Sequence, residues 1–323
     1  MGLEQYADQL IENKQVVTLM GPTASGKSAL AMALAERSEV PVELVSVDSA
    51  LIYQDMDIGT AKPTADEQQR VAHHLIDIRT PEQSYSAADF VQDVKAAVAE
   101  IFQKGHLPIL VGGTMMYFNA LQKGLSVLPE ADASIREKWL EIWEKTPEKL
   151  HQRLSEVDPN AAQRIHPNDS QRLVRALEVF EVSGQTLTAL QQAGVQPLTE
   201  FSLIKFALLP ADRSRLHQQI AKRFMQMVEA GLLDEVKTLQ AKYPQLHADL
   251  PSIRSVGYRQ AWAYLAGDYD EETFYHKGIV ATRQLAKRQI TWLRKEADLN
   301  LLDPFAHSME AQIAHIEQVL SQR

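Results

Sequence analysis

Short apolar stretches alternate with amphipathic helical patterns through most of the chain. Four of these stretches predict buried strands, over residues 16–20, 41–48, 107–111 and 201–209. Apolar residues at helical spacing fill segments between them, as in 86–102 and 213–229. A further apolar stretch at 299–302 predicts another strand, and 309–320 predicts a last helix. Strands that alternate with helices are typical of an α/β fold built on a parallel sheet.

The first predicted strand runs directly into a glycine-rich segment, which a helix-forming run of alanine and leucine residues follows. Strand, G-x-x-x-x-G-K-S and helix together indicate a phosphate-binding loop. Its two glycines let the backbone fold around an anion, and the helix N-terminus presents free N–H groups to that anion. Lys27 would neutralise the terminal phosphates, and Ser28 is placed to hold Mg²⁺. The same loop serves a triphosphate or a diphosphate. It comprises Gly21, Pro22, Thr23, Ala24, Ser25, Gly26, Lys27 and Ser28.

Polar residues follow two other predicted strands. Asp48 ends the strand 41–48, and Thr114 follows two glycines after 107–111. Because ligands collect beyond the carboxyl ends of parallel strands, both residues are expected near the phosphate loop. Asp48 has three open interpretations: an aspartate that supports a metal in phosphoryl transfer, a general base, or a residue that only caps a turn. The segment 49–63 lacks periodicity and predicts a long functional loop over the site.

The pattern changes between residues 124 and 199, where helical segments bounded by prolines replace the strands. We therefore predict a helical insertion domain over 124–199 within a P-loop NTPase-like parallel-sheet core. That core would comprise residues 1–123 and 200–323. Nothing in the sequence resembles a coiled coil or an exposed apolar helix, so a monomer is expected.

Composition narrows the function. The 323 residues include no cysteine, which excludes disulfides, thiolate metal sites and cysteine nucleophiles. No apolar run approaches the about 20 residues that span a bilayer, and the first residues lack a secretion signal, so a cytoplasmic protein without membrane contact is expected. The net charge of −9 argues weakly against a nucleic-acid partner.

The distribution of charge favours a polyanion at one place. Residues 277–295 contain six basic residues and no acidic one. Arg283, Lys287 and Arg294 recur at spacings of four and seven, which places them on one face of a helix. Such a basic face is expected where a polyanion binds, or it is a solvated face that pairs with acidic residues elsewhere.

Several motifs in the same order resemble the bacterial tRNA dimethylallyltransferases, of the tRNA isopentenyltransferase family. The resemblance covers about residues 16 to 295, and the runs 57–63 and 282–289 carry it most specifically. The motifs are Gly-Pro-Thr-Ala-Ser-Gly-Lys-Ser (21–28), Ser-Val-Asp-Ser-Ala-Leu-Ile-Tyr (46–53), Asp-Ile-Gly-Thr-Ala-Lys-Pro (57–63), Val-Gly-Gly-Thr (111–114), Gln-Arg-Leu-Val-Arg-Ala-Leu-Glu (171–178), Ser-Val-Gly-Tyr-Arg-Gln (255–260) and Thr-Arg-Gln-Leu-Ala-Lys-Arg-Gln-Ile-Thr-Trp (282–292).

The resemblance implies an enzyme that transfers a dimethylallyl group from dimethylallyl diphosphate to N6 of the adenosine just 3′ of the tRNA anticodon. It implies that the phosphate loop holds this diphosphate rather than ATP, with Mg²⁺ on Ser28. Asp48 then matches the general base, Thr114 a residue of the reaction channel, and Arg223 a residue that aids departure of the diphosphate. The helical insertion would grip the anticodon arm.

A set of tRNA-binding positions follows. The resemblance supplies Asp48, Ser49, Ala50, Leu51, Arg136, Gln171, Arg172, Leu173, Val174 and Arg175. We add Thr114, Arg254, Tyr258 and Arg259, and from the basic segment Arg283, Lys287 and Arg288.

Two other functions remain as alternatives. In a P-loop small-molecule kinase, Asp48 would activate a hydroxyl and the insertion would act as a lid. A non-catalytic RNA-binding or regulatory NTPase would keep its RNA affinity after Asp48→Ala and form no product.

Overall fold

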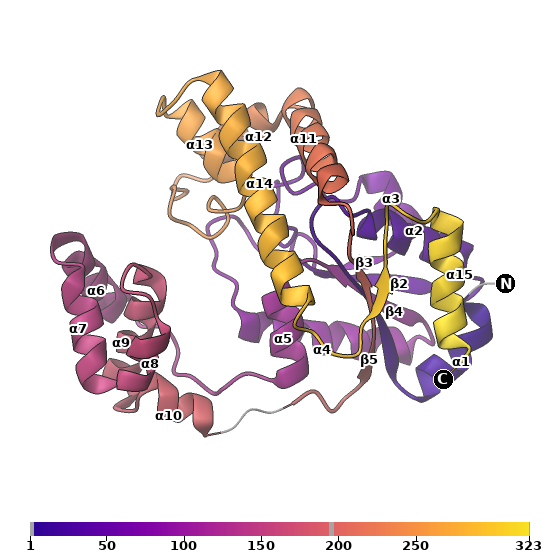
Figure 1. Ribbon diagram of the computed structural model, residues 1–323, viewed down its shortest axis with the longest axis horizontal. Coiled ribbons are helices and arrows are strands. Elements are labelled where there is room, and N and C mark those ends of the chain that lie inside the picture. The colour runs from indigo at the N-terminus through magenta and orange to yellow at the C-terminus, as the bar shows by residue number, and fades with distance from the viewer. Residues whose placement is uncertain (1–2, 194–196, 323) are drawn as a thin grey trace. The chain divides into compact units, whose positions relative to one another are not determined.

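The computed structural model describes residues 3–193 and 197–322, and its described strands form one parallel sheet of six. The order across the sheet is β3-β2-β4-β1-β5-β6, and every paired neighbour is parallel (Figure 1). The predicted α/β class and the predicted strands are confirmed. The strands are β1 (Gln15–Met20), β2 (Val42–Val47), β3 (His73–His74), β4 (Leu107–Gly112), β5 (Ser202–Leu208) and β6 (Asn300–Leu302).

Strand β1 lies between β4 and β5 and is covered on both faces, which explains its continuous apolar sequence. Val17 and Leu19 pack in a core with the helices α1 (Glu4–Glu12), α2 (Lys27–Arg37) and α15 (Met309–Leu320). Helix α4 (Ala87–Gln103) contacts β2 and β4 but is absent from that core, so it covers the other face (Figure 1).

The strand register brings three functional segments to one edge of the sheet. Gly112 pairs with both Met20 and Val47, so the segments after β1, β2 and β4 begin side by side. Gly112 leaves no room for a side chain there, because a Cβ atom would lie 2.0 Å from the carbonyl oxygen of Val47. Helix α5 (Met115–Lys123) starts directly after this point.

A second core of the same unit joins the segment after β2 to four later helices. These helices are α11 (Arg213–Glu229), α12 (Leu232–Lys242), α13 (Tyr258–Leu265) and α14 (Glu271–Leu293). Gly278 lets α14 approach α11 closely, since a Cβ atom would meet the ring of Phe224 at 2.0 Å. Short α3 (Ala65–Arg70) completes the unit, with a capping box between Thr64 and Glu67 at its start.

The contacts divide the chain into two compact units, Met1–Ala120 with Thr199–Arg323, and Leu121–Leu198. The second unit is helical and has its own core, in which Leu150, Leu154, Leu173 and Leu177 are buried. Asp158 fixes the last helix of this unit through hydrogen bonds from Thr188. Its helices are α6 (Ala133–Lys145), α7 (Glu148–Val157), α8 (Pro159–Arg164), α9 (Ser170–Ser183) and α10 (Leu187–Gln192).

No helix in the described ranges has the length and apolar character needed to cross a membrane.

Candidate active site

The phosphate loop joins β1 to α2 with the backbone conformation that its sequence predicts. Gly26 has a φ of 85°, in the left-handed region that favours glycine, and α2 begins at the next residue. Gly21 packs so closely that a Cβ atom would lie 2.7 Å from the Ser25 hydroxyl. That hydroxyl is buried and has no hydrogen-bond partner in the described part of the chain. A buried donor without a partner, beside the free N–H groups of a helix start, suits an anionic ligand.

A cavity of about 680 Å³ opens beside this loop, within the first unit. The cavity is lined by residues of the loop, of the segments at the ends of β2 and β4, and of α11 and α14. The structure therefore brings together most of the site predicted for this unit. The predicted residues that line it are Thr23, Ala24, Lys27, Ser28, Asp48, Ser49, Ala50, Leu51, Thr114, Arg223, Arg254, Tyr258 and Arg288.

Three charged side chains of the cavity influence one another. Burial lowers the pKa of Lys27 to about 8, although the charge of Asp48 acts to raise it, and Arg223 lowers it further. Burial also lowers the pKa of Arg223, again against the influence of Asp48. Two cations thus share a single carboxylate in a partly desolvated site, an arrangement that favours binding of a multiply charged anion.

Asp48 shows one of its three predicted roles, the turn cap. Its Oδ1 atom accepts hydrogen bonds from the backbone N–H groups of Ala50, at 2.8 Å, and Leu51, at 3.3 Å, so it caps the turn that follows β2. Its Oδ2 atom has no hydrogen-bond partner among the described residues. Thr114 accepts a hydrogen bond from the N–H of Ser49 at 3.1 Å, which ties the end of β4 to the residue after Asp48.

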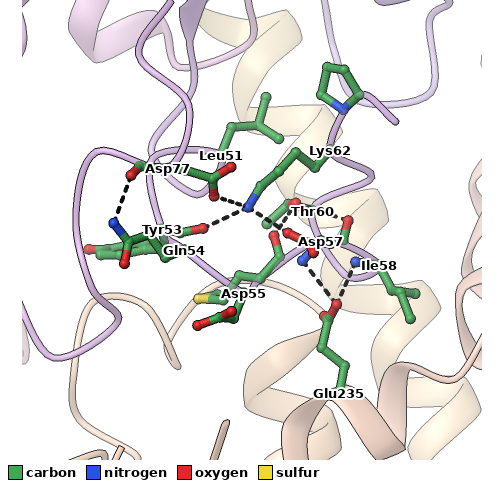
Figure 2. A network of polar contacts seen from close by, with 12 residues as sticks. Leu51, Tyr53, Gln54, Asp55, Asp57, Ile58, Thr60, Lys62, Asp77 and Glu235 are labelled. Atoms are coloured by element: carbon green, nitrogen blue, oxygen red, sulfur yellow. Dashed lines mark hydrogen bonds and ion pairs between the residues drawn. The ribbon is translucent and has the colours of Figure 1, made fainter. Parts of the chain in front are cut away.

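The predicted loop 49–63 is held in place by a buried lysine (Figure 2). The side chain of Lys62 is only 4% exposed, and its Nζ atom donates to the carbonyl of Tyr53 at 2.8 Å. The same atom pairs with Asp57 Oδ1 at 2.6 Å and with Asp77. Lys62 therefore joins both ends of the loop to the segment around Asp77.

A carboxylate from α12 fixes the middle of this loop. Glu235 accepts hydrogen bonds from the backbone N–H groups of Asp57, Ile58 and Gly59, at 2.9, 2.7 and 3.2 Å (Figure 2). Tyr258 donates its hydroxyl hydrogen to the same carboxylate at 2.5 Å. Gly59 must be a glycine here, because a Cβ atom would lie 2.5 Å from the Tyr258 ring.

One wall of the cavity is apolar and aromatic. Tyr53, Met115, Tyr117, Ile220 and Phe224 line it and are buried. Burial raises the pKa of Tyr117, and the carboxylates of Asp48 and Asp89 act in the same direction, so its hydroxyl stays neutral. An apolar group attached to a phosphate-bound ligand fits against this wall.

Some predicted tRNA-binding residues have other contacts. Leu173 and Val174 are buried in the core of the second unit, so their side chains are not available to a nucleic acid. Tyr258 is fully buried and engages Glu235. Gln171 and Arg172 are exposed and remain candidates.

Arg136 and Arg175 share one buried partner. Both bind the Oε2 atom of Glu178, at 3.0 and 2.8 Å, and Glu178 is completely buried. Their side chains keep exposed fractions of 46% and 30%, so each still presents a part of its guanidinium to solvent. Arg259 is exposed but lies outside the cavity wall.

The basic residues of α14 divide between two faces. The cavity is lined by Leu285, Arg288, Gln289 and Trp292. Lys287 is two residues from both Leu285 and Gln289, and two residues correspond to a rotation of about 200° around the helix axis. The side chain of Lys287 therefore points away from those of Leu285 and Gln289. Lys287 is exposed and lies on the side of α14 away from the cavity, whereas the Nε atom of Arg283 is buried. Of the predicted basic residues of α14, Arg288 lines the cavity, and Arg283 and Lys287 do not.

The sequence did not predict the residues of the apolar wall, nor Gln289, Trp292 and Met116. Gln289 accepts a hydrogen bond from the N–H of Thr23 at 2.8 Å and donates to the carbonyl of Gly113 at 2.9 Å. Trp292 and Met116 line the cavity with exposed fractions of 45% and 52%, so they form part of its rim. Gln289 and Trp292 lie in the motif 282–292, in which the sequence analysis assigns a role to the basic residues alone.

Comparisons with known proteins identify the family of this chain. The family model described as IPP transferase matches residues 51–296. A curated tRNA dimethylallyltransferase of Hydrogenovibrio crunogenus is 59% identical over 314 residues, which cover 97% of this chain and 96% of that protein.

Solved structures show the same relationship. A full-length tRNA isopentenylpyrophosphate transferase from Bacillus halodurans is 35% identical, with a TM-score of 0.69 and 96% coverage of both chains. A eukaryotic dimethylallyltransferase acting on tRNA is 26% identical, with a TM-score of 0.78, and the match covers 96% of this chain and 80% of that one.

Proposed function

The chain belongs to the IPP transferase family, and from this we propose that it is a tRNA dimethylallyltransferase. It transfers the dimethylallyl group of dimethylallyl diphosphate to N6 of the adenosine just 3′ of the anticodon, forming N6-isopentenyladenosine and diphosphate. The observation that carries this proposal is one cavity that combines a phosphate loop, two cations, an apolar wall and a carboxylate. As an enzyme of tRNA, it is expected to work in the cytoplasm, as a monomer.

The leaving group is the first demand of this reaction. Breaking the allylic C–O bond leaves a carbon with cationic character and a diphosphate that gains negative charge. Lys27, Arg223 and the N–H groups at the start of α2 stabilise that growing charge, which is the electrostatic form of catalysis. The apolar wall with Tyr53 and Phe224 holds the dimethylallyl group and keeps water away from the reactive carbon.

The nucleophile is the second demand. The exocyclic amine of adenine is a weak nucleophile, so a base that accepts its proton as the C–N bond forms lowers the barrier. Oδ2 of Asp48 is suited to accept this proton, because Oδ1 alone is used to cap the turn. Thr114, fixed to the N–H of Ser49, lies beside the same point and lines the channel.

A divalent cation fits the donor set. Ser28 is exposed to the cavity at the end of the phosphate loop, where its hydroxyl would hold Mg²⁺ together with phosphate oxygens. The described ranges contain no group of three or more His, Asp or Glu residues that could hold a metal ion. The phosphate oxygens of the bound ligand would therefore supply most of the ligands of the cation. When bound, Mg²⁺ would neutralise negative charge on the leaving diphosphate.

The tRNA needs further contacts, because the target adenosine must leave the stacked anticodon loop at a cost of a few kcal/mol. We propose that the helical unit Leu121–Leu198 grips the anticodon arm through Gln171, Arg172 and the exposed parts of Arg136 and Arg175. At the cavity rim, Arg288 and the half-exposed ring of Trp292 provide charge and a stacking surface.

The decisive experiment is mass analysis of tRNA nucleosides after incubation of the protein with Mg²⁺, dimethylallyl diphosphate and tRNA. We expect N6-isopentenyladenosine at the position 3′ of the anticodon, and none with Asp48→Ala. In a parallel binding assay, ATP should compete only weakly with labelled dimethylallyl diphosphate. Strong competition by ATP together with phosphoryl transfer to an alcohol would favour the small-molecule kinase instead.

A further inference from the structure

Gln289 makes a bridge that no part of the mechanism above has used. Its side-chain oxygen accepts the N–H of Thr23, inside the phosphate loop, and its side-chain nitrogen donates to the carbonyl of Gly113, at the end of β4. The three residues belong to three distant parts of the chain, since 266 positions separate Thr23 from Gln289 and 176 separate Gln289 from Gly113. The oxygen and the nitrogen of the amide are therefore both used, and they fix the distance between the phosphate loop and the end of β4.

The space around the bridge is closed. A Cβ atom on Gly113 would lie 2.4 Å from the side-chain nitrogen of Gln289 and 3.0 Å from the carbonyl oxygen of Gly21. The other limb of the phosphate loop is fixed to the same strand end, because the N–H of Gly21 donates to the carbonyl of Gly112 at 3.3 Å. The loop is thus tied to the end of β4 at both limbs, directly through Gly21 and through Gln289 at Thr23.

The strand end to which the loop is tied also carries the acceptor side of the site. Thr114 follows Gly113 and accepts a hydrogen bond from Ser49, which follows Asp48. A continuous series of contacts therefore runs from Thr23 through Gln289 and Gly113 to the residue beside Asp48. One end of this series holds the donor and the other holds the base.

We propose that Gln289 is a positioning residue that sets the distance between the diphosphate-holding loop and the Asp48–Thr114 pair. The inference rests on the proposed function, because a fixed distance matters when an allylic carbon on one side must meet an amine on the other. Transfer between two bound substrates is very sensitive to such placement, and a displacement of about 1 Å costs on the order of 10²-fold in rate. Gln289 acts on the chemical step and not on the binding of either substrate.

Simple packing of α14 does not require this bridge. Ala286, Ile290 and Leu293 are buried on the adjoining faces of the helix and already fix it to the unit. Gly278 adds its close contact with Phe224. Loss of the two hydrogen bonds of Gln289 should therefore leave the helix in place and change mainly the position of the loop.

Gln289→Met tests the proposal, because methionine keeps the length of the side chain and removes both hydrogen bonds. With saturating dimethylallyl diphosphate and tRNA, we expect the single-turnover rate to fall at least about tenfold, while the affinity for each substrate changes less than about threefold. Gln289→Asn keeps the amide but is one methylene shorter and cannot reach both partners, so it should be equally slow. Gln284→Met is the matched control, since Gln284 is exposed on the same helix, and it should keep the wild-type rate.

A wild-type rate in Gln289→Met or Gln289→Asn would overturn the proposal. So would a loss of rate that follows the fraction of folded protein in urea, because that result is expected of a residue with only a structural role.

Hydrogen exchange at the Thr23 amide gives a test that needs no chemistry. This N–H should be protected in the wild-type protein and exchange at least about tenfold faster in Gln289→Met, whereas Gln284→Met should leave it protected. Equal exchange in all three proteins refutes the bridge. If the Thr23 amide behaves as expected but the wild-type protein transfers no dimethylallyl group, the proposed function fails and the bridge to the loop stands.

Discussion

Lys27 is the residue at which the energetic cost of this site can be measured most directly. Burial is the largest cause that lowers the pKa of Lys27 from the usual 10.5 to about 8; Asp48 acts against it and Arg223 acts with it. One pKa unit corresponds to about 1.36 kcal/mol, so keeping Lys27 charged destabilises the ligand-free protein by about 3 kcal/mol at pH 7. Lys27→Met removes the charge and keeps the apolar stem. We therefore expect this variant to be more stable than the wild-type protein by up to about 3 kcal/mol at pH 7.

The pH dependence of this difference follows from the sign of the change. Below pH 8 the lysine is protonated in both the folded and the unfolded wild-type protein, so the full cost is present. Between pH 8 and 10.5 the folded state releases its proton first, and the unfolded state binds more protons. The stability of the wild-type protein therefore rises relative to Lys27→Met through this window, and the difference disappears near pH 10.5.

Urea unfolding of both proteins at pH 7, 8, 9 and 10 measures this difference, since changes elsewhere in the chain cancel between them. Inorganic diphosphate should stabilise the wild-type protein more than Lys27→Met, because the variant lacks one of the two cations that bind it. Lys27→Arg is the control: it keeps a charge at every pH of the series, so its stability should not approach that of Lys27→Met above pH 8. A Lys27→Met protein that is less stable than the wild type at pH 7 would show that attraction to Asp48 exceeds the cost of burial, and the reasoning would be refuted.

Three further results are expected. Asp48→Ala should lower turnover by about 10²-fold or more, and Thr114→Ala by about tenfold, with tRNA affinity in filter binding within about threefold of wild type; an equal loss of turnover and affinity would make both residues structural. Lys62→Met should lower the free energy of unfolding by about 2 kcal/mol, because Asp57 and Asp77 lose a buried partner. The loss is limited because both carboxylates stay hydrated, and an unchanged midpoint of urea unfolding would contradict the prediction. Arg283→Ala with Lys287→Ala should reduce the salt slope of tRNA binding by about 1.5; an unchanged slope would exclude these two residues from the tRNA interface.

The sequence predicted those parts of the site that depend on neighbours along the chain. A phosphate loop is recognisable because strand, glycines, Lys27 and helix are consecutive, and Asp48 is recognisable because it ends a strand. Gln289 and Glu235 could not be found in this way. Glu235 binds backbone N–H groups 178, 177 and 176 positions away, and backbone groups carry no signal in the sequence of their partners.

The assignment of tRNA contacts shows a different limit. The resemblance predicts tRNA contacts for the consecutive residues 171–175, but a helix exposes only part of any such run. Leu173 and Val174 face the core with Leu177, at the helical spacing that predicts a buried stripe, while Arg172 is exposed. The apolar spacing of 173, 174 and 177 alone therefore separates the buried residues of this segment from the exposed ones.

The geometry is also compatible with one aspartate that caps a turn and serves as the proposed base. Oδ1 accepts two backbone hydrogen bonds, which fix the orientation of the carboxylate without occupying Oδ2. The charge of Asp48 acts on both Lys27 and Arg223, the two cations of the cavity. A bound diphosphate would pair with the same two cations through its phosphate oxygens, so donor and carboxylate compete for them. Donor binding would therefore release Asp48 from these two charges before the amine arrives.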